Sequence, residues 1–173
     1  MLPDDVLLEI FHFYMIEDAE PGYRMGMWMR LVHVCQRWRS VVFGSPRRLD
    51  LQLVWSTRTP PDSLEVWPAL PLVIEDYNLQ KKGVDNIIAL LERSEFVRRV
   101  SLIRLFVVHL EDISEAMEVP FPELTHLWLR HSNDETEPIP LSDSFLGGSA
   151  PRLQFLRLDR VPFPGLQIGR AHV

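Results

Sequence analysis

The sequence predicts a protein of mixed helix and strand, with a small N-terminal helical head followed by repeated strand–helix units. Three observations lead to this prediction. Apolar residues recur at helical spacing between Leu2 and Val42, alternation typical of a strand begins near Leu49, and a short apolar motif then returns at a nearly constant interval. We expect the head to end near Gly44 to Leu53, where the texture of the sequence changes.

The first helical segment of the head is predicted from Leu2 to Phe11. Pro3 suits the first turn of a helix, where its missing N–H costs nothing, and Asp4 and Asp5 favour the positive end of the helix dipole. The apolar residues that follow at helical spacing are expected to form one face, made of Val6, Leu7, Ile10, Phe11 and Tyr14.

The second helical segment is predicted from Trp28 to Val42. Its apolar stripe advances in alternating steps of three and four residues. Gly44 and Pro46 are typical of the end of such a helix. The stripe contains Trp28, Leu31, Cys35, Trp38 and Val42, and it is widened by Val34 and Val41. Because Cys35 lies on the stripe, we expect a small buried side chain rather than a reactive thiol.

The two segments carry more large apolar residues than two short helices can bury against each other. A helical unit of this size normally needs a partner surface. The alternative is that the helices form an ordinary core within the same chain.

A repeat follows the head. Starting at Leu70, Val97, Leu124 and Leu153, short apolar motifs recur at steps of 27, 27 and 29 residues. Helical faces lie in two of the intervals: Val84, Ile87, Ile88 and Leu91 in one, and Leu110, Ile113 and Met117 in the other. This alternation favours a solenoid of strand–helix units, and the alternative is a compact α/β domain with evenly spaced strands.

The head resembles an F-box, most closely those of the expanded F-box-like families of mushroom-forming fungi. The resemblance is carried by Leu2-Pro3-Asp4-Asp5-Val6-Leu7-Leu8-Glu9-Ile10-Phe11 and by Val34-Cys35-Gln36-Arg37-Trp38-Arg39. Two features depart from the family. The connection with Glu17 to Gly22 is long, and Ser45 to Leu49 replaces the closing aromatic segment, so a third helix is expected to be short or absent.

The repeats are similar to irregular leucine-rich repeats, although the Asn that usually closes the strand motif is missing. Together the resemblances imply a substrate-receptor subunit of a Skp–cullin–F-box ubiquitin ligase, without catalysis and without a cofactor. The head would dock on a Skp-family adaptor, and through it on a cullin, with Leu2, Pro3, Val6, Ile10, Val34, Cys35 and Trp38 in the docking helices. The strand face would bind an unknown protein substrate through Arg99, Ser101, His126, Trp128, Gln154 and Arg157.

The predicted organisation has four parts. Residues 1–46 form the F-box-like head, 47–69 a connecting strand and a Pro-rich loop, and 70–166 the repeat segment, which we expect to be truncated. The tail 167–173 resembles a translated sequencing adapter, and we interpret it as non-native. We expect the chain to be a fragment of a longer protein.

Composition and motifs limit the cellular compartments and the functional classes that the sequence allows. A single cysteine, no signal peptide and no long apolar run favour the cytosol or the nucleus, with no membrane partner. We find no phosphate-binding loop, nucleophile elbow or set of metal ligands. Five arginines in and directly after the two predicted helices (Arg30, Arg37, Arg39, Arg47 and Arg48) raise the alternative of a helix-turn-helix nucleic-acid binder. The net charge of −6 and the acidic first helix argue against it. A second alternative is a leucine-rich-repeat binding module without a ubiquitin role.

Overall fold

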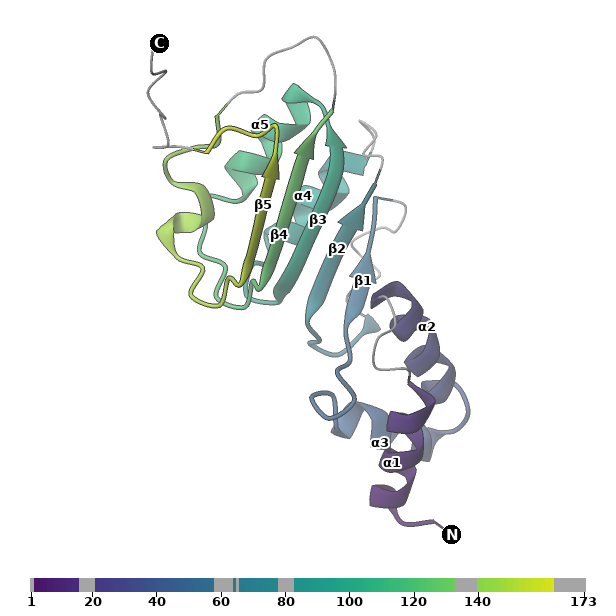
Figure 1. Cartoon of the computed structure of the whole chain (residues 1–173). Coiled ribbons are helices and arrows are strands. Elements are labelled where there is room, and N and C mark those ends of the chain that lie inside the picture. Colours follow the sequence, from purple (N-terminus) through teal and green to yellow (C-terminus); the bar gives the residue numbers. More distant parts are fainter. Residues whose placement is uncertain are drawn as a thin grey trace, which may run out of the picture. The chain divides into compact units, whose positions relative to one another are not determined.

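The computed structural model describes residues 2–15, 21–57, 64, 66–77, 83–132 and 140–163 (Figure 1). The predicted tail, and most of the two predicted loops at 17–22 and 57–62, lie outside this range. The chain forms two compact units, one made of Met1–Val54 with Leu64–Val73 and the other of Trp55–Ser63 with Ile74–Val173. The first unit therefore extends beyond the predicted boundary of the head at residue 46.

The prediction of mixed helix and strand is confirmed. The elements in chain order are α1 (Asp4–Tyr14), α2 (Pro21–Val32), α3 (Gln36–Gly44), β1 (Leu53–Trp55), β2 (Leu72–Asp76), α4 (Val84–Leu91), β3 (Val97–Leu105), α5 (Val107–Ala116), β4 (His126–His131), the 3-10 helix η3 (Phe145–Gly148) and β5 (Phe155–Asp159). The strands form one parallel sheet in which spatial order follows chain order, from β1 to β5.

The described residues of the head form three helices, and the prediction of one continuous helix from Trp28 to Val42 was wrong. α2 ends at Val32, and α3 begins at Gln36 with Cys35 as its N-cap in an extended conformation. The Cys35 sulfur accepts a hydrogen bond from the backbone N–H of Trp38 at 3.5 Å. The apolar residues keep their helical spacing across the turn between α2 and α3, so the sequence pattern did not reveal the break between the two helices.

The core of the first unit is built around Trp28, which is almost completely buried. Its ring meets Phe43 and Trp67 edge to face, at centroid distances of 6.1 and 5.5 Å. Its indole N–H donates to the carbonyl of Gln52 at 3.2 Å, so the polar atom of the ring is satisfied. Leu49 is buried in the same unit without being part of a strand, because β1 begins only at Leu53.

The prediction that α1 carries one apolar face was also wrong, because the helix carries two. Leu7, Leu8, Phe11 and Met15 are buried. A second group of apolar side chains is exposed on the other side of the helix. It consists of Val6, Ile10, Phe13 and Tyr14, whose spacing of three, four and eight residues places them on one helix face. The apolar periodicity of α1 therefore serves two surfaces, and only one of them is covered within the described residues.

The predicted repeat interval equals the sequence separation between residues that are paired on neighbouring strands of the sheet. Val100 of β3 is paired with Leu127 of β4, and Leu127 is paired with Leu156 of β5. These pairs reproduce the predicted steps of 27 and 29 residues. All pairings are parallel, so each strand returns to the same end of the sheet before the next begins.

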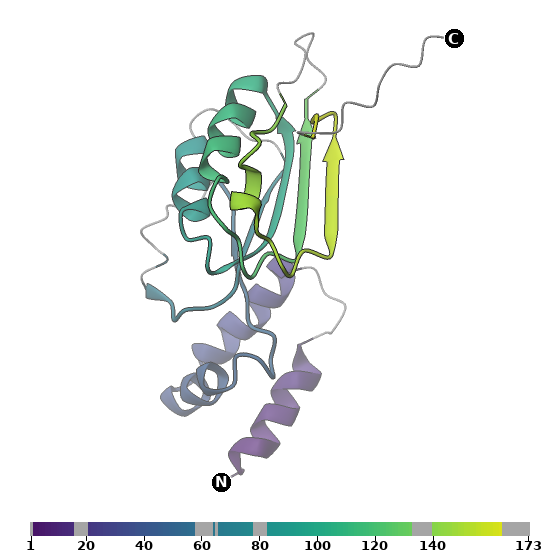
Figure 2. The ribbon, with the colours of Figure 1, turned by 90° about the vertical axis from the view of Figure 1, so that its left-hand side faces the viewer.

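Helices α4 and α5 and the 3-10 helix η3 lie on one face of the sheet (Figure 2). Leu127 and Leu129 point to this face and are fully buried, whereas Leu156, the counterpart of Leu127 in the edge strand β5, is 44% exposed. No described helix of the second unit lies over the opposite face of β3, β4 and β5 (Figure 2).

Gly147 and Gly148 form the end of η3. Gly147 adopts φ +54°, and a Cβ atom there would lie 2.5 Å from the backbone nitrogen of Pro120. Only glycine satisfies both the left-handed backbone and this close approach without strain.

Candidate functional site

The first candidate surface is the outer stripe of the head, defined as Leu2, Val6, Ile10, Phe13 and Tyr14. All five side chains are at least 40% exposed, and Phe13 reaches 83%. Such a set of large apolar side chains on one side of a short helix is typical of a protein-binding surface. Leu2, Val6 and Ile10 were predicted as docking residues. Phe13 was missed, although it lies three residues after Ile10 on the same side of the helix.

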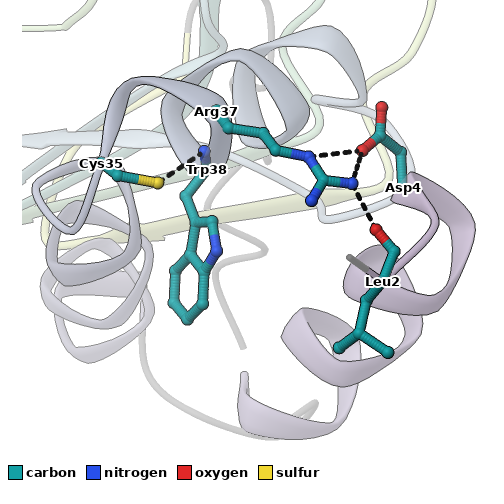
Figure 3. Close-up of polar contacts among 5 residues, drawn as sticks. All are labelled: Leu2, Asp4, Cys35, Arg37 and Trp38. Carbon is teal, nitrogen blue, oxygen red and sulfur yellow. Dashed lines mark hydrogen bonds and ion pairs between the residues drawn. The ribbon is translucent and has the colours of Figure 1, made fainter.

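The start of α1 is tied to the start of α3 (Figure 3). The guanidinium group of Arg37 donates to a carboxylate oxygen of Asp4 at 2.6 Å and to the backbone carbonyl of Leu2. Arg48 pairs with Glu9 and lies 4.0 Å from Asp5. These bonds hold the N-terminal segment that carries Leu2 in a fixed position relative to α3.

Trp38 of α3 packs against α1. Its ring lies 4.7 Å from the ring of Phe11, with the planes tilted by 60°. Phe11 is fully buried, whereas Trp38 is half-buried. In Figure 3 the indole of Trp38 and the side chain of Leu2 point in the same direction, away from the Arg37–Asp4 ion pair.

The remaining predicted docking residues are on the surface. Pro3 is exposed as the N-cap of α1, and Val34 is 59% exposed in the turn between α2 and α3. The prediction that Cys35 is buried was wrong, because the thiol is exposed. Its place before the first turn of α3, and not within a helix, turns the side chain back toward the N–H of Trp38.

Several arginines of the head are engaged by groups of the head itself. Arg37 and Arg48 bind carboxylates of α1, and Arg39 donates to the backbone carbonyl of Val32 at 3.0 Å. The acidic first helix therefore neutralises part of the basic run, which weakens the case for phosphate binding by this unit.

The second candidate surface is the open face of the sheet, which lies opposite to α4 and α5. We define it by three rows of side chains across β3, β4 and β5. The register places Arg99, His126 and Phe155 in the first row, Ser101, Trp128 and Arg157 in the second, and Ile103, Arg130 and Asp159 in the third. Five of the six predicted substrate-binding residues lie in these rows.

Gln154 is the exception. It precedes β5, and its backbone N–H donates to the carbonyl of Thr125 at 2.9 Å. Phe155 takes the place beside His126, and the two rings stack at a centroid distance of 5.8 Å. Counting the step of 29 residues from His126 would have identified Phe155. Ile103, Arg130 and Asp159 were missed because the predicted strand motifs stopped one row too early.

Trp128 at the centre of the open face is held by two neighbours on β5. Its indole N–H donates to Asp159 at 3.1 Å, and the guanidinium of Arg157 lies 4.8 Å from the centroid of its ring. Arg157 also pairs with Asp159 at 3.0 Å. The hydrogen bonds from Arg157 and then from Trp128 lower the pKa of the Asp159 carboxyl, so this group stays ionised and accepting. The central ring is thus fixed before any ligand arrives.

His126 lies in a positive environment. Partial burial, followed by the charges of Arg99 and Arg98, lowers the pKa of its imidazole below the ordinary 6.5. The ring is therefore neutral at pH 7 and contributes a flat, weakly polar surface next to Phe155. The open face therefore combines uncharged aromatic side chains with arginine side chains. The aromatic ones are His126, Phe155 and Trp128, and the arginines are Arg99, Arg130 and Arg157.

No described helix is long and apolar enough to cross a membrane. Comparison of the chain with protein-family models, with curated proteins and with solved structures gave no match.

Proposed function

We propose that this chain is a substrate-receptor subunit of a Skp–cullin–F-box ubiquitin ligase. In this proposal the head docks on a Skp-family adaptor, and the strand–helix units belong to an irregular leucine-rich-repeat solenoid that holds a target protein. The chain performs no chemistry. It acts by raising the effective concentration of its target near the ubiquitin-loaded enzyme.

The outer stripe is the observation that carries the proposal. α1 uses Leu7 and Phe11 for the core of the head and still exposes Val6, Ile10 and Phe13. The described fold covers those side chains only partly or hardly at all, and they match the place where the F-box resemblance puts the adaptor. An amphipathic helix with apolar anchors spaced in this way is a common form of helix-mediated recognition.

The repeat register supports the second half of the proposal. Parallel strands that follow one another in both chain and space, at steps of 27 and 29 residues, are typical of leucine-rich repeats. In such a solenoid the strand face is the surface that binds partners. The open face, with a fixed central tryptophan, suits this role.

Co-purification with a Skp-family adaptor tests the proposal. The full chain with Ile10→Asp should lose at least about 30-fold in affinity, because the new carboxylate would be buried against an apolar adaptor surface. Val108→Asp is the matched control, since Val108 is 61% exposed on α5 and the substitution likewise replaces a branched aliphatic side chain by a carboxylate. The proposal fails if the folded wild-type chain does not bind the adaptor, or if Ile10→Asp binds as tightly as wild type.

A further inference from the structure

We propose that the open face binds an extended acidic segment of a partner protein, with two carboxylates four residues apart and an apolar side chain midway between them. This inference rests on the proposed function, because it names the chemistry of the target that the strand face would hold. It is carried by the charge and spacing of the open face.

The charge of the open face is positive, in contrast to the net charge of −6 of the whole chain. Its three rows contain Arg99, Arg130 and Arg157 and one acid, Asp159. Arg157 pairs with Asp159, whereas Arg99 and Arg130 form no ion pair within the residues that the structure describes, although the charge of Arg130 also acts on the neighbouring Asp159. Two cationic groups are therefore left for a ligand.

The spacing of these two arginines sets the spacing of the ligand's acids. Arg99 is in register with His126, and Arg130 lies four residues further along β4. At roughly 3.3 Å per residue of extended chain, the two positions are about 13 Å apart along the strands. An extended peptide lying along the sheet places side chains i and i+4 on the same side at the same distance, so carboxylates at these positions reach both arginines.

The floor between the arginines is aromatic. His126 stacks on Phe155, which is 43% exposed, and Trp128 lies in the next row. The residue at position i+2 of the ligand faces this floor, where an apolar or aromatic side chain gains most. Because Trp128 is already held by Asp159 and Arg157, little ordering is required when the ligand binds.

The position of Asp159 favours a peptide over a nucleic acid. A polynucleotide carries a phosphate at every step and would place one near this ionised carboxylate, whose pKa is lowered within the fold. A peptide with two acids places a single carboxylate in this row, and that carboxylate meets the guanidinium group of Arg130, which is in register with Asp159. Binding of a nucleic acid is accordingly the competing outcome of the test.

The test is fluorescence anisotropy with the full chain and a short labelled peptide containing Asp-Ser-Phe-Ser-Asp. Replacing both aspartates of the peptide by asparagine should weaken binding about tenfold, because both ion pairs are lost. Arg99→Gln and Arg130→Gln should each weaken binding about two- to fivefold, and the double variant about tenfold, because the sites are far enough apart to act independently. Arg152→Gln is the matched control, since this exposed arginine pairs with Glu123 outside the open face.

Three results would overturn the inference: no saturable binding of the acidic peptide, equal binding of the asparagine peptide, or tighter binding of a mixed-sequence single-stranded oligonucleotide with a steep salt dependence. Ile10→Asp should leave peptide binding unchanged. Peptide binding without adaptor binding would therefore count against the proposed ligase role alone, and adaptor binding without peptide binding against the inference alone.

Discussion

Truncation to alanine is expected to lower the free energy of unfolding by very different amounts at two neighbouring residues of α1. Phe11 is completely buried and its ring contacts Trp38, whereas Ile10 is 46% exposed on the outer stripe. Phe11→Ala should lower the free energy of unfolding by about 3–5 kcal/mol, the cost of deleting a fully buried phenyl ring. Ile10→Ala removes a side chain that the fold covers only partly, so its cost should stay at about 1 kcal/mol or less.

Urea denaturation followed by far-ultraviolet circular dichroism measures this difference. With a slope of about 1–3 kcal/mol per molar urea, Phe11→Ala should shift the midpoint of the head's transition by roughly 1–2 M or more. Ile10→Ala should shift it by only a few tenths of a molar. Adaptor binding should show the reverse order at a temperature where both variants are folded, because only Ile10 belongs to the outer stripe.

An equal loss of stability in the two variants would refute this reasoning. It would mean that Ile10 is covered by other parts of the same protein, and that the outer stripe is ordinary core. The ligase-receptor proposal would then lose the observation that carries it.

Two further predictions concern the second unit. The imidazole of His126 should titrate below pH 6.5 by nuclear magnetic resonance, and Arg99→Gln should move its pKa back toward the ordinary value. Because the folded state disfavours the protonated ring, the unfolded state binds more protons below pH 6.5, and this contribution should make the protein less stable as pH falls from 6.5 through the folded-state pKa. An unchanged pKa in Arg99→Gln would contradict the assigned cause. Gly147→Ala should lower the thermal midpoint through a loss of about 1–3 kcal/mol, because the new Cβ meets the backbone of Pro120, whereas Gly148→Ala, with open space around its Cβ position, should cost less.

The order of the strands in the sheet follows directly from local sequence. The motif around Leu124 alternates between covered and open positions, and the spacing of the motifs around Val97, Leu124 and Leu153 equals the observed register. α4 also occupies the predicted place, since its apolar residues lie at helical spacing after Gly83. These features depend on contacts between residues near in sequence or on a period of two or 3.6, which a linear pattern records.

The interior of the head shows what such a pattern does not record. The stripe from Trp28 to Val42 keeps a helical phase although the helix is broken at Cys35, because a tight turn can return the chain to the same phase. The pattern on α1 likewise marks Ile10 and Phe11 as equally apolar. Only packing against α3 decides which of them is covered.

For the open face too, some features follow from the sequence and others only from the tertiary structure. The sequence by itself determined that Arg99, His126 and Trp128 share one side of the sheet, because side chains alternate strictly along a strand. Only the tertiary structure decided that Phe155 stacks on His126, that Trp128 is held by Asp159, and that Arg99 and Arg130 form no ion pair within the described residues. The physical reason is that these contacts join residues about thirty positions apart, and their geometry exists only once the parallel strands are paired in register.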